Sequence, residues 1–190
     1  RYDKDITTVC RFCLFLSAHE TTEEGCEPGL MEIARPEVNP FLLPEKWIST
    51  DLKEIEHIAP ENPLEGHRWD KNLYDSTEIH EIGNLSLLPK NVNISAGNKN
   101  WLEKLLYYQH LGLESNTDVL ALSEKANKNG IVLKSETIQL LRAARYSSHI
   151  KPIVKVGESG NWDINLVRKR SDKIYEIIWH RISPWIFENE

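Results

Sequence analysis

The chain has 190 residues, of which 40% are hydrophobic and 27% are charged, and six of them are Trp. This composition excludes a disordered chain, because it offers enough apolar surface for one sizeable core. No run approaches the roughly 20 apolar residues that span a bilayer, so we expect no membrane partner. Three cysteines do not form a disulfide framework, which favours a cytoplasmic location. Because the first residue is Arg1, we expect a piece of a longer protein.

The net charge of −6 argues against a nucleic-acid partner, but its distribution weakens that argument. Residues 1–70 hold 7 Lys and Arg against 15 Asp and Glu, whereas residues 142–173 are basic. We predict that this basic window holds a DNA backbone, helped by Lys104. The window contains Arg142, Arg145, Lys151, Lys155, Arg168, Lys169, Arg170 and Lys173. A solvated surface of mixed charge is the alternative.

Apolar spacing predicts the elements in chain order, beginning with a helix over 5–19. Residues 36–48 carry three prolines and predict an extended connector. Two short strands are predicted over 53–60 and 82–88, and the following segment, 90–97, predicts a turn. Further helices are predicted over 30–34, 98–112, 117–129, 135–146 and 163–182, the last ending before Pro184.

The predicted fold class is therefore α+β and mostly helical, with a short β-hairpin and a helix embedded in flanking helices. We expect a single domain in three parts. Residues 1–50 form a helical and extended lead-in, 51–112 form the strand–strand–helix core, and 113–190 form a helical C-terminal part.

Polar residues of the core fall where the chain changes direction. Glu56 and His57 lie at the end of the first predicted strand, and Asn84 opens the second. Asn93 lies in the turn before the helix, and His80 precedes Asn84 by four residues. A β-hairpin packed on a helix brings such points to one end, so these side chains predict a site.

Three motifs carry a resemblance to a known family. They are His57-Ile58-Ala59-Pro60, then Gly83-Asn84-Leu85-Ser86-Leu87-Leu88, and then Asn93 followed by Asn98, Trp101 and Lys104. In this order they resemble the HNH nucleases, whose fold is the ββα-metal finger. Among these, the sequence is most similar to the C-terminal nuclease domain of GmrSD-type restriction systems. The resemblance covers residues 51–105.

The resemblance implies a metal-dependent DNA endonuclease. It assigns His57 as the general base, Asn84 as the residue that positions it, and Glu56 and Asn93 as the metal ligands. The residue chemistry agrees, since a neutral imidazole can deprotonate water near neutral pH and oxygen ligands suit Mg²⁺ or Mn²⁺. Because successive strand residues point to opposite faces, Glu56 and His57 share one site only if the strand end bends. Alternative ligands are Asn91, Asn98 and His80.

Some members of the HNH family hold structural zinc, but Pro89 and Val92 stand where its cysteines would lie, so we expect no zinc. We expect Cys10 and Cys13 to be buried apolar side chains.

The resemblance also implies a bacterial anti-phage setting and an N-terminal sensor or NTPase part outside this chain. The rival hypotheses are a non-catalytic module that binds nucleic acid or protein and keeps a decayed hairpin, and an RNase or toxin that uses the same hairpin.

Overall fold

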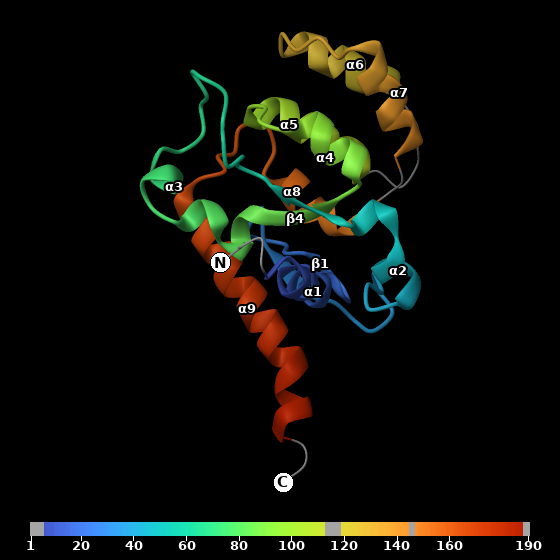
Figure 1. The fold of residues 1–190 in the computed structure, drawn as a ribbon, viewed down its shortest axis with the longest axis vertical. Helices are drawn as coiled ribbons and strands as arrows, with labels where there is room; N and C mark the ends of the chain where they lie inside the picture. Colours follow the sequence, from blue (N-terminus) through green and yellow to red (C-terminus); the bar gives the residue numbers. More distant parts are fainter. Residues whose placement is uncertain (1–5, 113–118, 145–146, 188–190) are drawn as a thin grey trace.

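The computed structural model describes residues 6–112, 119–144 and 147–187 (Figure 1). Its architecture is α+β and mostly helical, as predicted. The helices are α1 (Thr7–Ala18), α2 (Pro44–Ile48), α3 (Asn72–Asp75), α4 (Lys90–Ala96), α5 (Trp101–Leu111), α6 (Val119–Lys128), α7 (Ser135–Ala143), α8 (Lys151–Lys155) and α9 (Ile164–Phe187). The strands are β1 (Thr21–Glu23), β2 (Met31–Ile33), β3 (Glu54–His57) and β4 (Leu85–Leu88).

The strands form two separate antiparallel pairs, β1 with β2 and β3 with β4. The β3–β4 pair is the predicted hairpin, and its register places His57 opposite Leu85 and Glu56 opposite Ser86. The long connection between these strands carries α3 and two short 3₁₀ turns, η3 (Glu78–His80) and η4 (Ile82–Asn84).

The β3–β4 pair separates two hydrophobic clusters. Leu88 packs into the first cluster, with side chains of α4, α5 and α8, whereas Leu85 and Leu87 pack into the second, with side chains of α1 and α9. Figure 1 shows this arrangement, with α4 and α5 on one side of β4 and α1 on the other. Because β4 is covered on both faces, all four of its residues are buried.

Four sequence-based predictions need correction. Within residues 30–34, Met31–Ile33 form strand β2 rather than a helix, because they pair with β1. The connector 36–48 contains α2, which begins at Pro44, since proline is accommodated in the first turn of a helix. The segment after Pro89 is helix α4 rather than a turn. Helix α9 continues through Pro184 to Phe187.

In the part of the chain that the structure describes, no helix combines the length and the apolar character that a membrane span requires.

Gly83, the middle residue of η4, lies directly against α9. A Cβ at Gly83 would lie 2.0 Å from the carbonyl oxygen of Val167 and 2.5 Å from Oγ of Ser171, which accepts a hydrogen bond from the Gly83 N–H. A side chain here would push α9 away from the start of β4.

We therefore predict that Gly83→Ala lowers the free energy of unfolding by about 3 kcal/mol through overpacking. Urea denaturation measures this loss. Gly25→Ala is the matched control, because a Cβ at Gly25 meets nothing within 4 Å. Equal stability of the two variants would contradict the prediction.

Candidate functional site

The site is built where the end of β3 meets the start of β4. The backbone N–H of Ile58 donates to the carbonyl oxygen of Asn84 at 2.8 Å, directly after the pair formed by His57 and Leu85. The strand ends therefore bring His57 and Asn84 together, although they are 27 positions apart in the sequence.

The Asn84 side chain is fully buried and makes four hydrogen bonds. Its Oδ1 accepts from the Ala59 N–H and from Trp162 Nε1, both at 2.9 Å. Its Nδ2 donates to the carbonyl oxygens of Ala59 at 2.9 Å and Ile79 at 2.8 Å. These bonds use the whole capacity of an amide. The Asn84 side chain therefore acts on His57 through the backbone of Ala59, and the Asn84 carbonyl oxygen holds the N–H of Ile58. This role is that of a positioning residue.

His57 lies half-buried beside His80. The two rings meet edge to face, with 5.6 Å between their centroids. Burial lowers the pKa of His57 to about 4, and the charges of His80 and Lys104 add to this effect. The imidazole of His57 is therefore neutral at pH 7, which is the state that can accept a proton. The sequence offers His80 as an alternative metal ligand, and the fold places its ring in direct contact with the ring of His57.

Glu56 points to the opposite side of β3 and belongs to a buried ion pair. Its Oε1 lies 2.5 Å from Lys104 Nζ and 3.2 Å from the Tyr108 hydroxyl, both on α5. Lys104 Nζ also donates to the carbonyl oxygen of His57 at 2.7 Å. Burial raises the pKa of Glu56, while Lys104 opposes that rise.

This ion pair corrects two predictions. Glu56 does not fit the role of a metal ligand beside His57, because strand alternation turns its carboxylate into the interior toward Lys104. Lys104 does not lie on a surface that a phosphate could reach, because its side chain is completely buried. Lys104 instead fixes the backbone of His57 from the α5 side, through its hydrogen bond to the His57 carbonyl oxygen.

The amides predicted as further metal ligands lie on and after α4. Asn93 is half-buried within the helix, whereas Asn91 and Asn98 are exposed. Within the described ranges, no group of three His, Cys, Asp or Glu side chains is placed to hold a metal ion. Of the two predicted ligands, Glu56 is held in its ion pair with Lys104, and a metal-binding role for Asn93 stays a prediction.

One comparison with known proteins decides the family. The family described as GmrSD restriction endonucleases, C-terminal domain, matches residues 36–177. The chain belongs to this family. A search of curated proteins found no match. The matched segment contains the β3–β4 hairpin, α4 and α5, so this GmrSD-type domain carries its candidate site inside the family region. Membership identifies a nuclease module of the restriction-endonuclease type.

Arg170 does not belong to the DNA-binding surface that the sequence predicts for this GmrSD-type domain. It is 3% exposed, and its Nη1 donates to the carbonyl oxygens of Gly83 at 2.6 Å and Leu85 at 3.0 Å. Its guanidinium also lies over the ring of Trp162. Arg170 therefore ties α9 to the start of β4 and is a structural cation.

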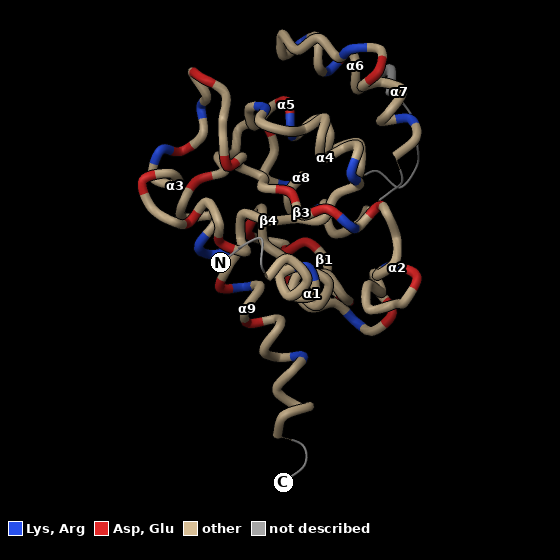
Figure 2. The backbone as a smooth tube through the Cα atoms, viewed as in Figure 1, with Lys and Arg blue, Asp and Glu red and all other residues tan. Residues whose placement is uncertain are grey.

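The other described bases of the window are interspersed with acids along the chain, and blue and red stretches alternate along α9 in Figure 2. Three of them form ion pairs with nearby carboxylates, namely Arg168 with Glu78, Lys169 with Glu27 and Lys173 with Glu176. Lys155 Nζ donates to the carbonyl oxygen of Glu24 at 2.7 Å. Arg142 is exposed on α7 and Lys151 is half-buried on α8, while Arg145 lies outside the described residues.

Two contacts at the site had no signal in the sequence. The Trp162–Asn84 bond joins residues 78 positions apart, and the Lys104–Glu56 pair joins residues 48 apart. Residue type alone indicates neither partner. Only the crossing of α5 and the loop before α9 over the hairpin brings them together.

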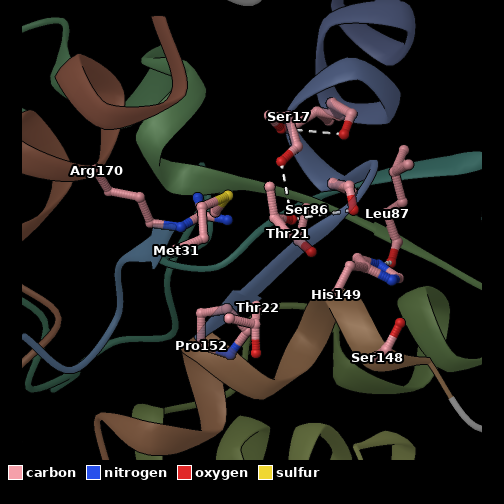
Figure 3. Close-up of a pocket in the computed structure, with 12 residues that line it drawn as sticks. Ser17, Thr21, Thr22, Met31, Ser86, Leu87, Ser148, His149, Pro152 and Arg170 are labelled. Carbon is pink, nitrogen blue, oxygen red and sulfur yellow. Dashed lines mark hydrogen bonds between the residues drawn. The ribbon is translucent and has the colours of Figure 1, made fainter. Parts of the chain in front are cut away.

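A small cavity of about 20 Å³ lies between β4, the end of α1, the β1–β2 pair and α8 (Figure 3). Ser86, His149 and Arg170 line it. His149 Nε2 donates to the carbonyl oxygen of Leu87 at 2.8 Å, and its ring lies against Phe41. A space of this size admits no nucleotide, so this cavity belongs to the core and not to the nuclease site.

The buried Glu56–Lys104 pair gives the first test of the site. Lys104→Met would leave the Glu56 carboxylate buried without its cation, so we expect a loss of about 3–5 kcal/mol in the free energy of unfolding. The double variant Glu56→Gln/Lys104→Met removes both charges, and we expect it to recover most of that loss.

Chemical denaturation of both variants measures these differences. Lys99→Met is the matched control, because Lys99 pairs with Glu103 on the partly exposed surface and we expect a cost below about 1 kcal/mol. A double variant as unstable as the single one would show that packing of the Lys104 chain, rather than charge pairing, holds this region together.

The cavity histidine predicts a pH dependence of stability. Burial lowers the pKa of His149 to about 4, against an ordinary value of 6.5 in the unfolded chain. Between these pH values the unfolded chain binds a proton that the folded protein excludes. We therefore expect this contribution to be complete above pH 6.5 and to be lost as pH falls toward 4.

Urea denaturation at several pH values between 4 and 6.5 measures how steeply the free energy of unfolding changes with pH. His149→Gln keeps a hydrogen-bond donor without a titrating group, so its stability falls less steeply with acid than that of the wild type. An unchanged slope would show that other groups cause the acid loss.

Proposed function

We propose that this domain is an HNH-type endonuclease that hydrolyses phosphodiester bonds in DNA, with His57 as the general base. The observation that carries the proposal is the neutral, half-buried imidazole of His57 at the end of a strand that Asn84 and Lys104 hold from two sides. Membership in a family of restriction endonucleases supplies the reaction class.

In the proposed step, His57 takes a proton from a water molecule whose oxygen forms a bond to phosphorus. The bond from phosphorus to the leaving sugar oxygen breaks, and that oxygen takes a proton from solvent water. Asn84 bonds the backbone of Ala59, and Lys104 bonds the carbonyl oxygen of His57. These bonds fix the backbone that carries the imidazole. His80 packs against one edge of the ring and limits its rotation.

We retain the requirement for Mg²⁺ or Mn²⁺ as part of the proposal, although Glu56 does not fit as its ligand. We assign the remaining exposed bases of the window, such as Arg142 and Arg168, to weak backbone contacts. By its family the domain would act in a bacterial anti-phage restriction system, with recognition supplied by an N-terminal sensor or NTPase part.

Plasmid cleavage tests the function. We expect the wild type to nick or linearise plasmid DNA with Mg²⁺ or Mn²⁺ and to be inactive with EDTA. His57→Ala should lower the cleavage rate at least about 100-fold, because it removes the base. His80→Ala should lower it less, and His180→Ala is the control because His180 is exposed on α9.

Three outcomes would contradict parts of this proposal. Full activity of His57→Ala would exclude His57 as the base, and cleavage that persists in EDTA would exclude the metal requirement. Cleavage of RNA without cleavage of DNA would favour the RNase hypothesis.

A further inference from the structure

Trp162 lies next to the candidate site, in the loop between α8 and α9. Its side chain is buried, and its Nε1 donates to Oδ1 of Asn84 at 2.9 Å. The other bonds of that amide go to Ala59, which follows β3, and to Ile79, which belongs to η3. Trp162 therefore joins the C-terminal part of the chain to the amide that positions His57.

The loop that carries Trp162 is fixed on both sides of this residue. Before it, a Cβ at Gly160 would lie 2.2 Å from the carbonyl oxygen of Val156, so the chain approaches the end of α8 as closely as only glycine allows. After it, the N–H of Ile164, the first residue of α9, donates to Oδ2 of Asp70 at 3.0 Å. The backbone therefore presents the indole to the hairpin in one orientation.

The indole ring of Trp162 is also held by its neighbours. It stacks on Trp101, with 5.7 Å between the ring centroids and 27° between the ring planes. The guanidinium of Arg170 lies over the same ring, 5.8 Å from its centroid. Trp101 in turn meets Trp69 edge to face at 6.2 Å. Aromatic pairs of this kind add stabilisation beyond their buried area, so the direction of the Trp162 N–H toward Asn84 is fixed.

The three indoles of this stack form the same kind of hydrogen bond to different partners. Nε1 of Trp69 donates to the carbonyl oxygen of Lys99 at 3.3 Å, and Nε1 of Trp101 donates to that of Gly157 at 3.0 Å. Of these three, it is Trp162 that donates to the side-chain amide of the site. The stack therefore offers a direct comparison between a bond to the site and an equivalent bond elsewhere.

We propose that Trp162 is a positioning residue of the nuclease, which orients the Asn84 amide and, through it, the backbone that carries His57. Its effect on cleavage rests on the proposed function. The Asn84 side chain bonds both the N–H and the carbonyl oxygen of Ala59, so a change in the amide plane moves the backbone directly after His57. Because a general base must stay within hydrogen-bond distance of its water, this movement slows the chemical step more than it weakens DNA binding.

Replacing the indole of Trp162 by benzothiophene tests this role, because the isostere keeps the shape of the ring system and loses the N–H. We expect kcat for plasmid cleavage to fall about 10-fold, with KM for DNA changed by less than about 2-fold. The same replacement at Trp101 is the matched control, since it removes an equivalent bond from the same stack. We expect the control to keep kcat within about 2-fold of the wild type.

A second measurement does not depend on cleavage. The imidazole signals of His57 in NMR spectra of the 190-residue chain are assigned by their loss in His57→Ala. We expect these signals to shift in the Trp162 isostere and to stay unchanged in the Trp101 isostere.

Two results would overturn the proposal. One is a set of His57 signals that the Trp162 isostere leaves unchanged, and the other is a kcat that is unchanged or falls equally in both isosteres. A wild type that cleaves no DNA would refute the proposed function instead, and the NMR comparison would then decide the role of Trp162.

Discussion

One buried amide holds the functional part of this domain together. The four hydrogen bonds of Asn84 join the chain after β3, the η3 turn and the loop before α9, which are otherwise distant in sequence. In a low-dielectric interior each of these bonds is strong, and each would be costly to leave unmade. The position of His57 therefore depends on the bonds that Asn84 makes to the backbone that follows it.

Strand alternation places the proposed catalytic side chain and a buried ion pair on opposite sides of β3. Glu56 and His57 are neighbours in β3, but one faces α5 and the other faces His80. The inward carboxylate is neutralised by Lys104, which in turn holds the His57 carbonyl. Glu56 and Lys104, which the sequence suggests for the site, instead form a buried ion pair that holds β3 in place. Arg170 has the same structural role at the start of β4.

The elements with strong periodic patterns agree with the sequence-based predictions. The helices around α1, α5 and α9 and both strands of the β3–β4 pair are found where apolar spacing places them. The wrong predictions concern short elements and one helix end, since α9 continues through Pro184. Strand β2 exists because it pairs with β1, and α4 is too short for a helical repeat to show, so tertiary contacts decide both. The same limit applies to the site, where the His57–Asn84 approach was predicted and the partners of Glu56 were not.

The sequence by itself determined the family, the hairpin and the approach of His57 to Asn84, because the motifs around these residues follow one another at recognisable spacing. Only the tertiary structure decided which charged side chains are exposed at the surface and which are buried. Lys104 and Arg170 have the same residue types as surface bases, yet both are buried by helices that cross the hairpin. Burial and pairing depend on contacts across 48 to 87 positions, and local sequence carries no record of such contacts.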